Sequence, residues 1–156
     1  MMSRARFILF LVVLFFVHLL FYEYLSTGKT YPDLFLVLTV FAALRWGAEA
    51  GSLSGFLTGL IQDSFGFTFF GLHALSSTIV GFIVGRTRQA FYGNNILVQF
   101  IIIFVAKVLH DLIFYGVYLS RQSGSFWGQI FVDTPLNALY TCVLGLVLYH
   151  AINFKS

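Results

Sequence analysis

Charged side chains are scarce in this chain of 156 residues: only 10% are Asp, Glu, Lys or Arg, whereas soluble domains carry about 25%. A water-soluble fold of this size has too few charges to cover a composition that is 59% hydrophobic. The net charge of +3 comes from basic residues scattered singly, which argues against a nucleic-acid-binding patch. In lipid the same composition is favourable, because the solvent itself is apolar.

Cysteine occurs once, at Cys142, which excludes an intramolecular disulfide and a cysteine-based metal cluster. Because it lies in an apolar stretch, we expect a packed, unreactive thiol. The chain also lacks a nucleophile elbow, an HExxH motif and a phosphate-binding loop, so no enzymatic activity is expected. The histidines are dispersed over different predicted helices, and we therefore expect no metal site and no cofactor: His18, His73, His110 and His150.

Long apolar runs are what the chain has instead of charges. A helix needs about 20 residues to cross the hydrocarbon core of a bilayer. Hydropathy and turn signals predict an all-α polytopic membrane helix bundle with six transmembrane helices in a single domain 1–156, with spans at about 5–25, 33–44, 47–62, 69–85, 96–119 and 130–152. The first run follows basic residues, as a signal peptide does, but it is long and no cleavage site follows, so a retained helix is expected.

The region 33–61 is too long for one simple span, and Arg45, Trp46 and Glu49 divide it. We expect two short helices joined by a tight turn, and one long broken helix is the alternative. With six spans and a cytoplasmic N-terminus, the basic residues on the cytoplasmic side outnumber those outside: Arg4, Arg6, Arg45, Arg86, Arg88 and Lys155 against Lys29 and Arg121. This bias obeys the positive-inside rule and predicts that both termini are cytoplasmic.

Glycines recur every four residues in the span 47–62, and so lie on one helix face: Gly47, Gly51, Gly55 and Gly59. Small residues let another backbone approach closely, which is how membrane helices pack. Gly81 and Gly85 repeat this spacing once. Packing within the chain is the simpler interpretation, and docking of another protein's transmembrane helix is the functional one.

Two aspartates are expected at helix ends. Pro32 and Asp33 precede an apolar run, as residues that start a helix do. Asp63 ends the span 47–62, where a carboxylate opposes the helix dipole and needs a partner. His73 and the backbone amides of the 66–71 turn are the candidate partners, and an ordered structural cap is favoured over a ligand site.

Lys107, His110 and Asp111 lie in the middle of the longest predicted span. Charges at bilayer depth cost at least about 2.5–3.5 kcal/mol on insertion scales and usually face the protein interior. Lys107 and Asp111 are four residues apart and can pair on one helix face. An interhelical brace is favoured over a proton or ion relay, because no further acids follow along the helix. In the last span, Asp133, Pro135 and Asn137 indicate a polar helix start.

The order of these motifs resembles the MreD family. Pro32-Asp33-Leu34 opens a short apolar helix, and the later motifs are Gly51, the run 55–63, the stretch 71–75 that begins Gly71-Leu72-His73, and Gly81–Gly85 followed by Arg86. The chain length and the count of six helices are similar as well. The match is specific over about residues 31–88, and elsewhere it rests on hydropathy and on Asn137 in the final helix.

The resemblance implies a non-enzymatic protein of the bacterial cytoplasmic (inner) membrane that binds the bitopic protein MreC. With MreB, RodA and a class B transpeptidase, such proteins form the elongasome, which directs lateral peptidoglycan synthesis and sets cell shape. The expected surroundings are membrane lipids, and the partner helix is expected to dock on the glycine face 47–59.

The resemblance also implies a fold similar to the membrane substrate-binding components of energy-coupling-factor (ECF) transporters. The alternative function is therefore a substrate-binding subunit of a small-molecule, vitamin-type transporter. It requires an outward pocket lined by Asp63, His73 and Asp111, whereas the short loops favour the scaffold.

Overall fold

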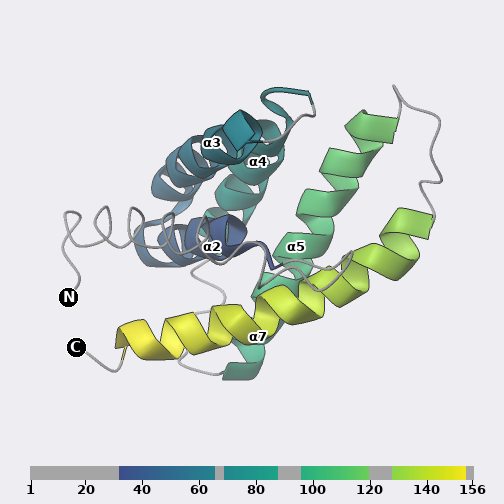
Figure 1. Cartoon of the computed structure of the whole chain (residues 1–156). Coiled ribbons are helices and arrows are strands. Elements are labelled where there is room, and N and C mark those ends of the chain that lie inside the picture. The colour runs from purple at the N-terminus through teal and green to yellow at the C-terminus, as the bar shows by residue number, and fades with distance from the viewer. Residues whose placement is uncertain (1–31, 66–68, 88–95, 120–127, 154–156) are drawn as a thin grey trace.

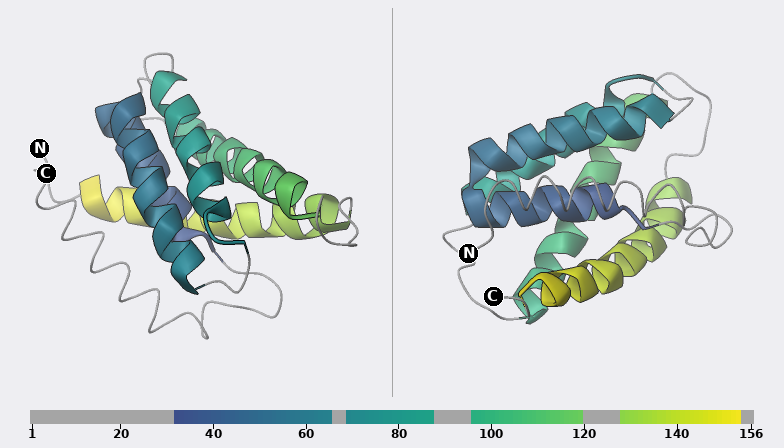
Figure 2. Two further views of the ribbon diagram at one scale, coloured as in Figure 1. Left: turned by 90° about the horizontal axis from the view of Figure 1, so that it is seen from above. Right: turned by 60° about the vertical axis from the view of Figure 1, so that its left-hand side comes forward.

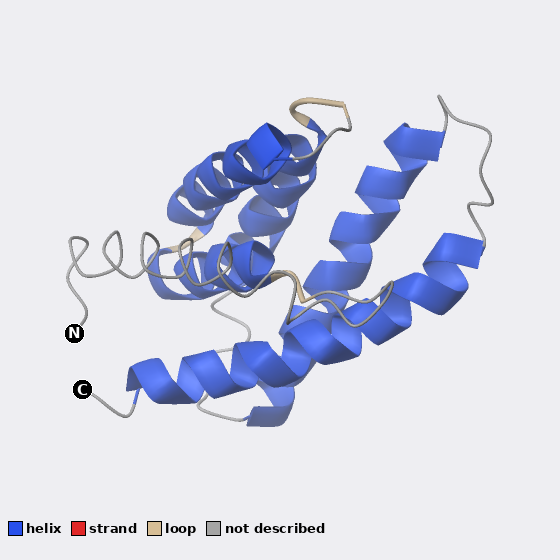
Figure 3. Cartoon of the chain, in the orientation of Figure 1, coloured by secondary structure: helices blue, strands red, loops and turns tan. Residues whose placement is uncertain are grey.

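The computed structural model of the chain describes residues 32–65, 69–87, 96–119 and 128–153, and every regular element within these ranges is a helix (Figure 1 and Figure 3). The elements are α2 (Leu34–Trp46), α3 (Ala48–Phe65), α4 (Leu72–Thr87), α5 (Ile96–Leu119), the π-helix η2 (Gln129–Asp133) and α7 (Thr134–Asn153). The all-α prediction is confirmed for this part of the chain. The predicted first helix, 5–25, lies outside the described residues.

Gly47 separates α2 from α3, which confirms two short helices in the region 33–61. Its φ of 95° is one that residues with a side chain rarely adopt, and its N–H donates to the carbonyl of Ala43 at 2.9 Å. Arg45 and Trp46 were expected to divide the region but form the last turn of α2. With η2 and α7 taken together as one span, the other helix ends differ from the predicted spans by three residues at most, because caps and turns decide where a helix ends.

Helices α2, α3 and α4 lie side by side and form the α2–α4 unit, while α5 and α7 cross each other and form the α5–α7 pair (Figure 1 and Figure 2). The closest packing is between α3 and α4, and α5 packs on both α4 and α7. Helix α2 contacts α3, α4, α5 and α7, and every residue from Leu34 to Ala43 is buried. A helix that is apolar all round belongs inside a structure, and α2 occupies the centre of the described part.

The hydrophobic core forms where α2, α4, α5 and α7 meet. Its buried members are Leu36, Val37, Val40, Ala43, Val80, Val84, Ile103, Ala106 and Cys142. Cys142 is fully buried, and its thiol donates a weak hydrogen bond to the carbonyl of Phe100 at 3.6 Å. The thiol is thus packed in the core, as expected from its apolar stretch.

The glycine face of α3 packs against α4, which is the simpler of the two interpretations of the glycine spacing. A Cβ added to Gly51, Gly55 or Gly59 would lie closer than 3.0 Å to the backbone of α4. Gly81 and Gly85, on α4, are equally close to the backbone of Gly51 and Ala48. Gly47 lies in the turn before α3 and not on the face. The residues Gly47, Gly51, Gly55 and Gly59 therefore serve packing within the chain and leave no groove for another helix.

The outward faces of the described helices are apolar. Large hydrophobic side chains are exposed on α3, α4, α5, η2 and α7, among them Leu53, Leu75, Phe82, Ile101, Phe131 and Leu139. Among the described residues, two helical stretches are long and apolar enough to cross a membrane, Ile96–Tyr118 and Ile130–Val147, and α2 is a shorter apolar helix. A surface of this kind is typical of contact with lipid or with other apolar helices.

Candidate functional site

Asp33 begins α2 and is the centre of a buried polar network. Its Oδ1 accepts a hydrogen bond from the N–H of Leu36 at 3.0 Å, which is the expected N-cap. Its own N–H donates to Oγ1 of Thr141, on α7, at 3.0 Å. The residue is only 5% exposed, so its carboxylate needs further partners inside the protein.

Lys107 supplies the main counter-charge. Its Nζ lies 2.8 Å from Oδ1 of Asp111, one turn along α5, as the spacing predicts. It also lies 3.3 Å from Oδ2 of Asp33, on α2. All three side chains are buried, so one ammonium group bridges two carboxylates away from water. The sequence did not indicate the contact with Asp33, because the two residues are 74 positions apart.

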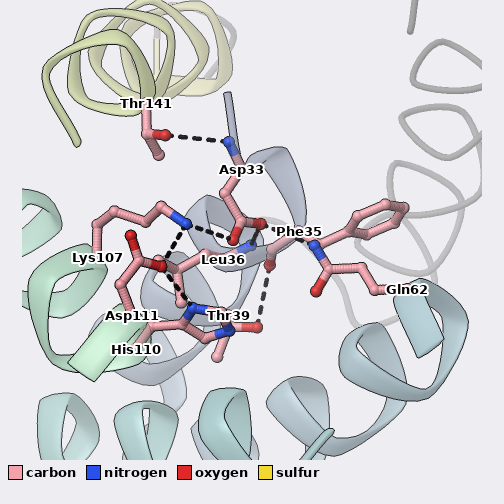
Figure 4. A network of polar contacts seen from close by, with 9 residues as sticks. All are labelled: Asp33, Phe35, Leu36, Thr39, Gln62, Lys107, His110, Asp111 and Thr141. Atoms are coloured by element: carbon pink, nitrogen blue, oxygen red, sulfur yellow. Dashed lines mark hydrogen bonds and ion pairs between the residues drawn. The ribbon is translucent and has the colours of Figure 1, made fainter. Parts of the chain in front are cut away.

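Two more side chains complete the network, as Figure 4 shows. Nε2 of Gln62, near the end of α3, donates to Oδ1 of Asp33 at 3.0 Å. Nδ1 of His110 lies 3.1 Å from Oδ1 of Asp111. An ionised carboxylate only accepts hydrogen bonds, so this contact requires the proton on Nδ1. The network therefore joins α2, α3, α5 and α7 through polar groups.

His73 brings the aromatic side chains of α4 and α5 against this network. Its ring stacks on His110 with centroids 5.7 Å apart and lies 4.3 Å from the ring of Phe114. Phe114 stacks on Tyr118, which meets Phe69 edge to face. Sequence dispersal gave no sign that these two histidines meet. Even so, among the residues that the structure describes, no group of three or more His, Cys, Asp or Glu side chains is arranged to hold a metal ion.

Asp63 caps α4 from the neighbouring helix. Its Oδ2 accepts from the N–H groups of Gly71 and Ala74, both at 3.0 Å, and its Oδ1 accepts from the N–H of His73 at 3.1 Å. Three amides at a helix N-terminus, where the dipole is positive, give the buried carboxylate the partner it needs. Gly71 has a φ of 95°, which suits its place in the turn. The ordered cap is thus observed, with the backbone and not the imidazole of His73 as partner.

The last predicted span, 130–152, is formed by η2 and α7, and α7 begins among the polar residues that were expected near the helix start. The π-helix η2 precedes α7, and Pro135 lies in the first turn of α7. Because Pro135 has no N–H, the turn before it lacks one α-helical hydrogen bond, which fits a π-type turn at this place. Thr134 and Asn137 are buried, and Asp133 ends η2.

Several buried polar atoms of the site have no hydrogen-bond partner among the described residues: Gln62 Oε1, His73 Nδ1, His110 Nε2 and Asp111 Oδ2. Each charged side chain of the site, in contrast, has at least one polar partner within the protein. Such an arrangement holds helices together. It provides neither a nucleophile with its base nor a set of metal ligands.

The chain was compared with protein families, with curated proteins and with solved structures. The family model described as rod shape-determining protein MreD matches residues 2–154, nearly the whole chain. No curated protein and no solved structure matches. The expected likeness to ECF substrate-binding components therefore stays a prediction. A family match over this length decides the assignment: the chain belongs to the MreD family of rod shape-determining proteins.

Proposed function

We propose that this protein is a non-enzymatic membrane scaffold of the rod-shape complex, which binds MreC and helps to direct lateral peptidoglycan synthesis. Family membership supports a role in shape determination. The observation that carries the proposal is the distribution of polar groups in the described helices. Their buried charges pair with one another inside, while large apolar side chains face outward. Such a molecule is built to bind other apolar helices and not to transform a substrate.

The proposed topology has six membrane crossings with both termini in the cytoplasm. Arg45 and Arg86 support it, because they lie in the last turns of α2 and α4 at the same end of the α2–α4 unit, where Gly85 packs on Gly47 and Ala48. Basic residues mark the cytoplasmic end of membrane helices. A reporter fused to the C-terminus tests the topology: activity in the periplasm and none in the cytoplasm would contradict it.

The MreC helix must dock on a face other than the glycine face, which α4 covers. The candidates are the outward faces of the described helices. A photo-crosslinking residue placed at one exposed position per helix tests them: Leu53 on α3, Leu75 on α4, Ile101 on α5 and Leu139 on α7, with buried Ala106 as the control position. Crosslinks to MreC from one face and none from Ala106 are expected. Failure of MreC to co-purify from native membranes would refute the scaffold proposal.

The transporter alternative receives less support from the same contacts. It needs Asp63, His73 and Asp111 to line an outward pocket. Asp63 instead accepts three backbone hydrogen bonds, and Asp111 is bound to Lys107. His73 packs against the ring of Phe114. Asp63, with both carboxylate oxygens bonded to the backbone, is poorly placed to select a soluble substrate, although His73 Nδ1 and Asp111 Oδ2 have no partner among the described residues.

We propose that the Lys107 network is a brace between helices and not a proton relay. A relay requires a series of titratable groups leading across the membrane. The charged groups of this network, Asp33, Lys107 and Asp111, instead pair with one another. In a relay, neutral substitutions would abolish activity without weakening assembly. In a brace, they weaken assembly itself.

A further inference from the structure

The two parts of the described fold are joined by hydrogen bonds that meet at one residue. Asp33 belongs to the α2–α4 unit, and its Oδ2 receives Lys107 of α5 while its N–H reaches Thr141 of α7. Figure 4 shows Asp33 between Thr141 on one side and Lys107 with Asp111 on the other. A single residue thus contacts both helices of the α5–α7 pair.

Each charged partner also has a bond within its own part of the fold. Oδ1 of Asp33 keeps the N–H of Leu36 and the amide of Gln62, both in the α2–α4 unit. Lys107 keeps Asp111 on its own helix, and at 2.8 Å this contact is shorter than the 3.3 Å contact with Asp33. If the two parts separate at this point, no charge is left without a polar partner. Separation still removes the counter-charge of Asp33 and so has a cost, but the two hydrogen bonds to Oδ1 of Asp33 and the ion pair of Lys107 with Asp111 remain.

The remaining contacts between the two parts are mainly apolar, and they include the hydrophobic core, where side chains of α2 and α4 pack against those of α5 and α7. The rings of His73 on α4 and Phe114 on α5 pack at 4.3 Å, and Phe69, which precedes α4, meets Tyr118 further along α5. On the other side, Gly145 lets α7 pack against Val37 of α2. Dispersion contacts between rings and aliphatic groups have little directionality. A small rotation of one part against the other would thus shift these apolar contacts, whereas it would break the directional hydrogen bonds of Asp33.

We propose that Asp33, with Lys107 and Thr141, is a latch that holds the α2–α4 unit against the α5–α7 pair and opens with each charged side chain keeping a polar partner. The closed state is the one described above. In the open state Lys107 stays on Asp111, and Asp33 stays on Leu36 and Gln62. The latch gives the protein two arrangements of the same rigid helices, independently of which partner binds outside.

Spin-label distance measurements on the full chain in lipid nanodiscs test this latch. Two label pairs serve, Leu53 with Leu136 and Leu53 with Val147, because the α7 positions lie on either side of Thr141 and all three are exposed. Buried Cys142 is replaced by alanine in every chain compared. The substitution Asp33→Asn retains a side-chain oxygen for the N-cap but removes the charge that holds Lys107. A hydrogen bond to a charged group corresponds to about tenfold or more in an equilibrium constant.

We expect Asp33→Asn to add a second distance population of at least about a tenth of the molecules, raised from a minor state in the parent chain. Thr141→Val removes the other bond without changing any charge, and it is expected to shift the same distances in the same direction by less. Gln62→Leu is the matched control, because it removes a bond to Asp33 that lies within the α2–α4 unit, and its distances should equal those of the parent. Distributions of Asp33→Asn and Thr141→Val that superimpose on the parent would overturn the proposal, as would opening caused by Gln62→Leu. Thr141→Val keeps the test valid if Asp33→Asn does not fold.

Discussion

Lys107 is the residue whose replacement should destabilise the interior most, and the charge of the network explains why. It lies within 3.3 Å of Asp33 and 2.8 Å of Asp111, all three buried. Lys107→Met keeps most of the side-chain volume but leaves two carboxylates facing each other without the ammonium between them. Removing one partner of a buried ion pair costs about 3–5 kcal/mol, and we expect a loss of unfolding free energy at the upper end of that range.

Neutral replacements of the carboxylates should follow a different order. Asp111→Asn leaves the Asp33–Lys107 pair intact, so its expected cost is about 1–3 kcal/mol, the value of a hydrogen bond to a charged group. The double change of Lys107→Met with Asp111→Asn still leaves Asp33 without an ammonium. Only the triple change, which adds Asp33→Asn, removes every charge of the ion pairs, and it should be milder than Lys107→Met alone.

Reversible unfolding in mixed micelles, followed by far-UV circular dichroism, measures these differences. The reasoning is refuted if Lys107→Met is no more destabilising than Asp111→Asn. It is equally refuted if the triple change is as damaging as the single change at Lys107. A stable Lys107→Met chain that loses only its cellular activity would favour the relay over the brace.

Two further predictions use the same unfolding measurement, and a third uses co-purification. Gly55→Ala should cost about 1–3 kcal/mol or more, because the added Cβ meets the backbone of Ser77, whereas Gly116→Ala, with nothing within 4 Å, should be neutral or stabilising by up to about 1 kcal/mol. Equal effects of the two would contradict the packing described for α3 and α4. Asp63→Ala should lower the free energy of unfolding by about 3 kcal/mol or more, because all three backbone amides lose their acceptor. Asp63→Asn should lower it clearly less, because asparagine keeps one side-chain oxygen. The double variant Gly55→Leu with Gly59→Leu should lose its fold and for that reason no longer co-purify with MreC. If the double variant folds well but does not bind MreC, the glycine face is the docking surface after all.

Local features of the fold were predictable because their causes are local. The apolar run 96–119 has the same limits as α5, and the four-residue spacing of Lys107 and Asp111 led directly to their ion pair. Asp33 was expected to cap a helix and does so through Leu36. Each of these depends on residues within one or two helical turns of one another, where geometry follows from the sequence.

The partners that lie far apart in the chain were not predictable in the same way. Asp33 meets Thr141 across 108 positions, and nothing near either residue indicates the contact. The signal in the sequence was the small number of charged residues in the apolar stretches. A carboxylate or an ammonium group in such a stretch needs a polar partner inside the protein. The glycine spacing predicted a close approach but not which helix would make it. A side-chain partner was as reasonable for Asp63 as the backbone amides that it binds.

The central position of α2 constrains the order in which this protein is assembled. With 13 residues, α2 is about 20 Å long, whereas the hydrocarbon layer is about 30 Å thick. Its neighbours α5 and α7 are synthesised after it. A nascent chain that ends after α4 therefore lacks two of the four described helices that contact α2. The carboxylate of Asp33 also lacks the ammonium group of Lys107 in such a chain. Release of α2 from the insertion machinery is then favourable only once α5 emerges. Shortened chains that end before Lys107 should accordingly be cleared by membrane proteases and not accumulate as partial bundles.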